Sequence, residues 1–339
     1  MKTKFRFDWF MTGMAVAVLL AWLFPDPGAD GGSLQPALVT NLGVATIFFL
    51  HGISLSLSAL KQGMLQWQQH LLVQSCVFLL FPIIGVSLYF LSSGWLPESL
   101  RMGFLFLCAL PSTVSTSVAL TATAYGNVPI ALFSATISSL IGVALTPMWM
   151  GIAVDSSQPQ GSLSHIVLSL FLLLVIPLIA GQMARHWLGD WGNRNKKLIN
   201  NVDRIIILFL VYTSFCDSFQ MGIWTRYGLH AVVWTVLLSL FLFGLVFFLV
   251  ELICRSLKLS QADRIAVLFC GTKKSLATGI PMSQVMFSGN PALGLILLPI
   301  MVYHPMQLII CGILAGRWAK DYERTVVHSQ KTDVDHQIQ

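Results

Sequence analysis

Two adjacent lysines, Lys273 and Lys274, lie in the middle of a long apolar run of the sequence. They come nine and ten residues after Arg264, which is about 14 Å along a helix that rises 1.5 Å per residue. That depth is close to the midplane of a hydrocarbon layer about 30 Å thick. A charge there costs at least about 2.5–3.5 kcal/mol, so intramembrane lysines are candidates for function. The chemistry they suit is binding of anions or of backbone carbonyl groups.

Two interpretations of the lysines remain open. If the helix breaks near Cys270–Gly271, its last carbonyls lose their partners, and the negative end of the helix dipole lies there. One ammonium can then satisfy those carbonyls while the other faces a cavity. Alternatively, both lysines belong to a purely structural polar network. No carboxylate occurs in the runs 101–125 or 265–288 to neutralise either charge.

A second polar cluster follows Pro111 inside another apolar run. Proline removes a backbone donor and disrupts a helix, and the freed groups in a membrane need partners or a water-filled cavity. One interpretation is a proline kink whose backbone is satisfied by nearby hydroxyls. The other is an unwound crossover whose carbonyls and hydroxyls bind an ion or a substrate. The candidate binding residues here are Ser112, Thr113, Ser115, Thr116 and Ser117.

Further polar residues lie inside apolar runs. Thr272 and Ser275 flank the two lysines, and Gln74 lies in a third run. His304 precedes Pro305 and is interpreted either as a proton carrier or as a hydrogen-bonded packing residue. We find no Gly-rich phosphate loop, HExxH or GxSxG, so the sequence gives no case for an enzyme. The six cysteines form no CxxC pair and are interpreted as buried apolar residues.

The elements that position these residues are apolar helices in a bilayer. The chain of 339 residues is 55% hydrophobic and 10% charged, whereas soluble domains carry roughly 25% charged residues. Runs of spanning length predict an all-α polytopic membrane protein with ten transmembrane helices. They lie near 8–24, 38–57, 70–91, 101–125, 129–150, 164–183, 202–221, 230–254, 263–288 and 291–316. The run at 8–24 is interpreted as a retained helix, and the tail from Arg317 is expected to be frayed.

The basic residues test this division. With the N-terminus in the cytoplasm, sixteen of the twenty fall on the cytoplasmic side, as the positive-inside rule predicts. Only Arg101 and Arg226 fall on the other side, and two are the buried lysines. The sixteen are Lys2, Lys4, Arg6, Lys61, Arg185, Arg194, Lys196, Lys197, Arg204, Arg255, Lys258, Arg264, Arg317, Lys320, Arg324 and Lys331. Both termini are therefore expected in the cytoplasm of a bacterial inner-membrane protein. The net charge of +6 and pI near 9.1 reflect these loops rather than nucleic-acid binding.

The fourth and ninth runs resemble each other. Each has a cysteine, then a Ser/Thr-rich patch, and ends in Gly-Asn before a proline, with 18 residues from Cys108 to Gly126 and 19 from Cys270 to Gly289. Each is the fourth helix of a five-helix half. Five is an odd number, so the halves cross the membrane in opposite senses. The sequence predicts two inverted repeats, 1–150 and 151–318, followed by a polar cytoplasmic tail at 319–339.

These two motifs resemble the bile acid:sodium symporter family, solute carrier family 10, closest to its member 7-like branch. The runs that carry the resemblance are Pro-Ser-Thr-Val-Ser-Thr-Ser at 111–117, followed by Gly-Asn, and Phe-Cys-Gly-Thr-Lys-Lys-Ser-Leu-Ala-Thr-Gly-Ile-Pro at 269–281. The resemblance spans the whole chain except the tail. It implies a core domain and a panel domain, broken helices 4 and 9 that cross in the core, and an anion site between the domains.

The resemblance also implies sodium as a coupling ion, and this sequence departs from that pattern. Better-known members have a glutamate where this chain has Phe269, and a Gln-Asn pair where it has Lys273-Lys274. Their hydroxyl ligands on the fifth helix correspond to Ala131 and Ala135. A site without a carboxylate and with added positive charge holds Na⁺ poorly. We hypothesise that a lysine ammonium replaces one sodium. The remaining weak sodium site that the resemblance allows comprises Ser115, Thr116, Cys270 and Thr272.

The sequence therefore predicts a secondary transporter of a sterol-like or bile-acid-like organic anion that works by alternating access. Transport would be uncoupled, proton-coupled, or coupled through the remaining sodium site, with no other cofactor. The alternative is a non-transporting membrane regulator of ion homeostasis that acts through a partner. An ion channel is disfavoured, since no ring of filter residues is seen. The substrate, the stoichiometry and the oligomeric state do not follow from the sequence.

Overall fold

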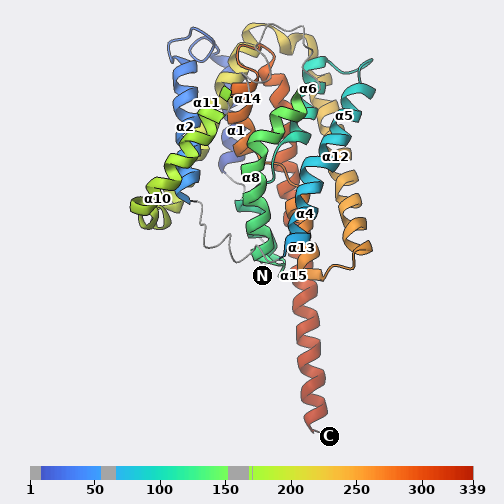
Figure 1. Ribbon diagram of the computed structural model, residues 1–339. Coiled ribbons are helices and arrows are strands. Elements are labelled where there is room, and N and C mark those ends of the chain that lie inside the picture. The colour runs from blue at the N-terminus through green and yellow to red at the C-terminus, as the bar shows by residue number, and fades with distance from the viewer. Residues whose placement is uncertain (1–8, 55–65, 152–167, 170, 339) are drawn as a thin grey trace.

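The chain folds into a bundle of helices, described here from a computed structural model (Figure 1). The structure describes residues 9–54, 66–151, 168–169 and 171–338, and these contain no strand. Lys2, Lys4, Arg6 and Lys61 lie outside them. The elements are α1 Trp9–Leu23, α2 Pro36–Ser54, α4 Trp67–Ser75, η1 Cys76–Leu80, α5 Phe81–Leu91, α6 Glu98–Ala109, α7 Ser115–Thr123, α8 Val128–Met150, η2 Phe171–Val175, α10 Ile176–Arg194, α11 Lys196–Gln220, α12 Ile223–Ser256, α13 Gln261–Gly271, α14 Leu276–Met286 and α15 Leu293–Ile338.

Seven of the described helical stretches are long and apolar enough to cross a membrane. They are α2, α4–η1–α5, α8, η2–α10, α11, α12 and the first 32 residues of α15. Helix α1 is apolar but shorter, and α6–α7 and α13–α14 are pairs of short helices. The prediction of an all-helical, multi-pass membrane protein is confirmed at this level. The count of ten spans stays a prediction, because it requires each broken pair to cross the membrane as a unit.

The two segments that resemble each other in sequence break at the same place. Helix α6 ends at Ala109, one residue after Cys108, and α13 ends at Gly271, one residue after Cys270. The chain then runs without helical structure for a few residues until α7 and α14 begin. Pro111 explains the first break, because it lacks the N–H that would continue the ladder. Each polar patch thus lies in a break or in the first turn of the helix that follows it.

Close helix packing depends on glycines at two contacts. Helix α2 packs along α10, where Gly52 faces the Leu178 carbonyl and Gly181 faces the Phe49 carbonyl so closely that a Cβ on either would clash. Helix α1 packs on α11, and α11 in turn packs on α14 and α15. Elsewhere α6 packs on α5 and α15. The broken helices α6–α7 and α13–α14 are therefore surrounded by other helices.

The expected fraying of the C-terminal tail is wrong. Helix α15 continues without interruption to Ile338 and projects beyond the bundle (Figure 1). Extending an existing helix needs no new nucleus, so even a polar sequence can add turns to it. At the base of the projection, Tyr125 stacks on Tyr322 with ring centroids 4.4 Å apart, and its hydroxyl donates to Glu323 at 3.3 Å.

Candidate functional site: the crossing of two broken helices

The two breaks contact each other directly through the backbone. The Ser275 N–H donates to the Pro111 carbonyl at 2.9 Å. The Ser112 hydroxyl donates to the Cys270 carbonyl at 2.6 Å, and the Ser117 hydroxyl donates to the Phe269 carbonyl at 3.1 Å. These carbonyls belong to the last turn of α13, which has no intrahelical donors for them. Hydroxyls of the first broken helix therefore cap the end of the second.

The remaining hydroxyls of the 111–117 cluster link to one another and to α8. Thr113 and Ser117 share a hydrogen bond of 2.9 Å, and Thr116 donates to Thr113 at 2.9 Å. The Ser112 N–H donates to the Ser138 hydroxyl of α8 at 2.9 Å. Of the predicted cluster, Ser112, Thr113 and Ser117 are buried, Thr116 is half-buried, and Ser115 is exposed at the start of α7.

Lys274 is fully buried, and its ammonium is held by three backbone carbonyls. The Nζ atom donates to Cys108 at 2.7 Å, to Leu110 at 2.7 Å and to Val77 at 3.0 Å. The ring of Phe81 lies on another side, with its centroid 4.2 Å from Nζ. The three donors of an ammonium are thereby satisfied. The Lys274 ammonium occupies a carbonyl cage of the kind that oxygen-seeking cations prefer.

The third carbonyl of the cage is available because of a proline. Pro82 lacks an N–H, so neither Val77 nor Phe78 receives a backbone bond from position 82, and the chain forms the π-helical turn η1 there. Side chains donate to both carbonyls instead. The Lys274 ammonium donates to the Val77 carbonyl, and the indole N–H of Trp149 donates to the Phe78 carbonyl at 2.9 Å. Pro82 thus leaves the Val77 carbonyl free to accept from Lys274.

A side-chain amide fixes the backbone of Lys274. The Gln307 side chain of α15 accepts from the Lys274 N–H at 2.8 Å and donates to the Lys274 carbonyl at 2.8 Å. Its Nε2 also lies 3.1 Å from His304 Nδ1. One turn earlier, the Tyr303 hydroxyl donates to the Thr272 carbonyl at 2.9 Å. Three backbone groups of the unwound chain are therefore anchored to α15.

Lys273 differs from its neighbour. Its side chain is also fully buried, yet its Nζ has no hydrogen-bond partner among the described residues. The ring of Phe269 lies 5.5 Å away and offers only a weak cation–π contact. In the part of the chain that the structure describes, no ion pair joins either lysine to a carboxylate. A buried ammonium without a partner is costly, so Lys273 is the amine of the crossing whose charge has no compensation among the described residues.

Other predicted site residues have contacts that do not reach the lysine ammonium groups. The Thr272 hydroxyl donates to Leu268 within its own helix at 2.7 Å, and Ser275 caps α14 by accepting from Thr278 at 3.2 Å. Gln74 donates to the Ser134 carbonyl at 2.9 Å. It also lines an apolar groove of about 470 Å³ between α4–η1 and α8. His304 is buried beside Gln307.

Three residues of the predicted weak sodium site are hydrogen-bonded to groups outside it. The Cys270 carbonyl is used by Ser112, and the Thr272 hydroxyl turns back to its own helix. Ser115 and Thr116 lie on α7, where Thr116 donates to Thr113. The described structure pairs Cys270 with Ser112 rather than with the two α7 hydroxyls. The occupancy of this site stays an expectation.

Sequence reasoning missed several groups and misplaced one contact. It expected a lysine to satisfy the carbonyls of its own helix near Cys270, whereas Lys274 binds carbonyls of α6, the following residue and η1. The carbonyls at the end of α13 accept instead from hydroxyls of the 111–117 cluster. Gln307 and Tyr303 were detectable only as polar groups in the last apolar run. The positions of Pro82 and Trp149 carried no signal for a contact with position 274 or with its cage.

A helical membrane bundle in which two interrupted helices meet at a buried polar crossing is typical of membrane transporters. Comparison with known protein families agrees with this class. The chain belongs to the SBF-like CPA transporter family, whose model matches residues 8–320. The uncharacterized protein PA2026 of Pseudomonas aeruginosa is 40% identical over 94% of this chain and 95% of its own length. The putative symporter YfeH of Escherichia coli is 38% identical over 94% of each chain.

A vertebrate relative extends the similarity. Sodium/bile acid cotransporter 7 of Rattus norvegicus is 34% identical over 92% of this chain and 92% of its own. The predicted resemblance to the bile acid:sodium symporter type is therefore confirmed, and two of these relatives, YfeH and the rat protein, are named as transporters rather than as enzymes. The chain is a multi-pass membrane protein of this transporter type.

Proposed function

We propose that the protein is a secondary transporter of an organic anion that works by alternating access, and that the Lys274 ammonium permanently replaces one coupling cation. One observation carries the proposal. A fully buried ammonium is bound by three carbonyls from two segments at the crossing of the broken helices. A cation held there by the chain itself keeps the crossing assembled without Na⁺. Coupling to protons, or uncoupled transport, then follows.

The architecture we propose has ten spans. The broken pairs α6–α7 and α13–α14 each count as one, as does α1, and the two inverted repeats are 1–150 and 151–318. A panel of α1, α2, α10 and α11 rocks against a core of the other helices, since these four pack mainly on one another. Both termini lie in the cytoplasm of a bacterial cell, with the tail 319–339 on that side.

An anion suits the charges at the crossing. Lys273 is a buried cation with no carboxylate partner in the described chain, and helices α7 and α14 both begin at the breaks. Helix N-termini and cations lower the energy of a negative charge nearby. Ser115, exposed at the start of α7, gives the break access from outside the packed core. The names of the vertebrate relatives suggest a bile-acid-like substrate class.

The test is uptake of radiolabelled taurocholate, a bile acid, by vesicles of bacterial polar lipids that contain the purified protein. We expect uptake above that of protein-free vesicles, and equal initial rates in Na⁺ and K⁺ media within about twofold. Uptake that needs Na⁺ overturns the role of Lys274. No uptake of taurocholate or of other labelled organic anions favours a membrane regulator that transports nothing alone.

A cross-link between the proposed core and panel tests alternating access. The Gln284 amide of α14 donates to the Ser214 hydroxyl of α11 at 2.6 Å and to the Leu210 carbonyl at 3.1 Å, which joins the proposed core and panel. A Gln284→Cys/Ser214→Cys protein treated with a short bifunctional thiol reagent is expected to lose at least about 90% of its uptake. Gln284→Cys alone, treated in the same way, is the matched control for the six native cysteines.

A further inference from the structure

We propose that His51 and Asp203 form a proton-binding site where α2 and α11 meet the first turn of α14. The coupling role of this site rests on the transport function proposed above, whereas its ability to bind a proton does not. Neither residue takes part in the crossing of the broken helices. Together they are an ionisable pair at the boundary between the proposed panel and core, which is where a coupling proton has to act.

The pair joins two helices of the panel. His51 Nε2 of α2 lies 3.5 Å from Asp203 Oδ1 of α11. The Asp203 side chain is 15% exposed and that of His51 is 38% exposed. Oδ1 is itself buried and has no hydrogen-bond partner among the described residues. A protonated imidazole gives this buried carboxylate oxygen a charged partner, which a neutral imidazole does not.

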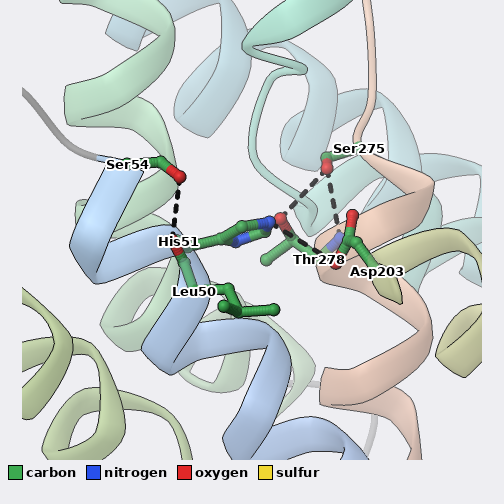
Figure 2. Close-up of polar contacts among 6 residues, drawn as sticks. All are labelled: Leu50, His51, Ser54, Asp203, Ser275 and Thr278. Carbon is green, nitrogen blue, oxygen red and sulfur yellow. Dashed lines mark hydrogen bonds and ion pairs between the residues drawn. The ribbon is translucent and has the colours of Figure 1, made fainter. Parts of the chain in front are cut away.

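The pair faces the core. Figure 2 shows His51 and Asp203 directed toward Ser275 and Thr278, whose hydroxyls lie 3.0 Å apart at the start of α14. Both α2 and α11 pack against α14. Ser275 directly follows Lys274, and its N–H donates to the Pro111 carbonyl. A change of charge at the pair therefore acts next to the break of the second helix.

Few other charges face this site. Helix α14 and the turn η2 contain no ionisable residue. On α10, the guanidinium of Arg185 is used by the Ile53 carbonyl at 2.9 Å. On α11, Arg204 lies over the rings of Trp9 and Phe10 of α1. Asp203 is therefore the carboxylate that decides the charge of the imidazole, and the pair changes between net zero and net negative.

The change in net charge of the His51–Asp203 pair affects how an organic anion binds. With the imidazole neutral, the Asp203 carboxylate leaves a negative charge at the boundary between the proposed panel and core and repels an organic anion. With a proton on His51, the pair is neutral and the anion is accepted. One proton bound per anion makes the two move together.

The first test requires no substrate. In protein labelled with ¹³C in its histidine rings, the His51 resonance is assigned by its loss in His51→Gln. We expect this resonance to move with pH, and its titration curve to change in Asp203→Asn. Asp217→Asn, on the same helix, is the matched control and leaves the curve unchanged. A His51 resonance that does not move, or identical curves in all three proteins, overturns the proposal.

The second test measures coupling with taurocholate as the probe. Vesicles with a more acidic exterior by one pH unit are expected to accumulate it to about ten times the external concentration, the gradient that about 1.4 kcal/mol supports. His51→Gln and Asp203→Asn are expected to lose this accumulation while they still exchange labelled for unlabelled anion. Accumulation that persists in both variants overturns the coupling role. Absence of any exchange in the wild type contradicts transport of this anion, while the resonance test still decides the proton site.

Discussion

Replacement of Lys274 by methionine is expected to lower the thermal midpoint of the purified protein by about 10 °C. The change removes three hydrogen bonds at once and leaves the Val77, Cys108 and Leu110 carbonyls without donors. Each buried carbonyl without a partner costs about 1–3 kcal/mol. Relief of the buried charge offsets part of this, and a net loss of about 3–5 kcal/mol remains. At roughly 2–4 °C per kcal/mol, such a loss is measurable by melting in detergent.

The adjacent lysine supplies the matched control. Lys273 is equally buried but has no hydrogen-bond partner in the described chain. Lys273→Met removes an uncompensated charge and no hydrogen bond, and methionine fills a similar volume. We therefore expect a midpoint that is unchanged or raised by a few degrees. Equal losses in the two variants would contradict the assignment of the cage to Lys274.

Gln307→Leu is expected to be the second most damaging change. The leucine has a similar size but leaves both the N–H and the carbonyl of Lys274 buried without partners. These two groups together cost about 2–5 kcal/mol. The unwound segment at 272–275 has no ladder of its own to replace them. The expected result is a fall in the thermal midpoint of at least about 5 °C.

Another glutamine on the protein surface is the control for this change. Gln220, at the end of α11, is exposed and donates to Asp26 at 2.8 Å. Gln220→Leu loses a contact that water replaces, so the midpoint should fall by less than about 2 °C. If Gln307→Leu and Gln220→Leu have the same thermal midpoint, the Gln307 side chain does not stabilise the unwound segment.

The helices could be predicted because each needs a long apolar run, and the sequence shows ten such runs. The breaks could also be predicted, since Pro111 removes a donor and the two lysines are too polar for an ordinary span. The matched positions of Cys108 and Cys270 indicated that the two segments are related, and each helix ends one residue after its cysteine. The helical structure of the C-terminal tail could not be predicted, because the polar composition of the tail does not indicate that it extends the preceding helix.

The partners at the crossing were beyond the reach of sequence reasoning. Spacing along one helix indicates which residues share its face, but the cage of Lys274 comes from two other segments. Its third carbonyl depends on Pro82, nearly two hundred residues earlier in the chain. Asp203 lies at the very start of the predicted run 202–221, where spacing along one helix gives no sign that it pairs with His51 of another helix.

The most direct test of the central claim is thermal stability titrated with Na⁺ against K⁺ at constant ionic strength. A ligand at ten times its dissociation constant stabilises the folded state by about 1.4 kcal/mol. The account predicts no Na⁺-specific rise in the wild type, because the Lys274 ammonium already occupies the carbonyl cage. It predicts such a rise in Lys274→Glu, where a carboxylate and free carbonyls can hold the ion. A Na⁺-specific rise in the wild type that Lys274→Glu does not exceed would contradict the claim that the protein carries its own cation.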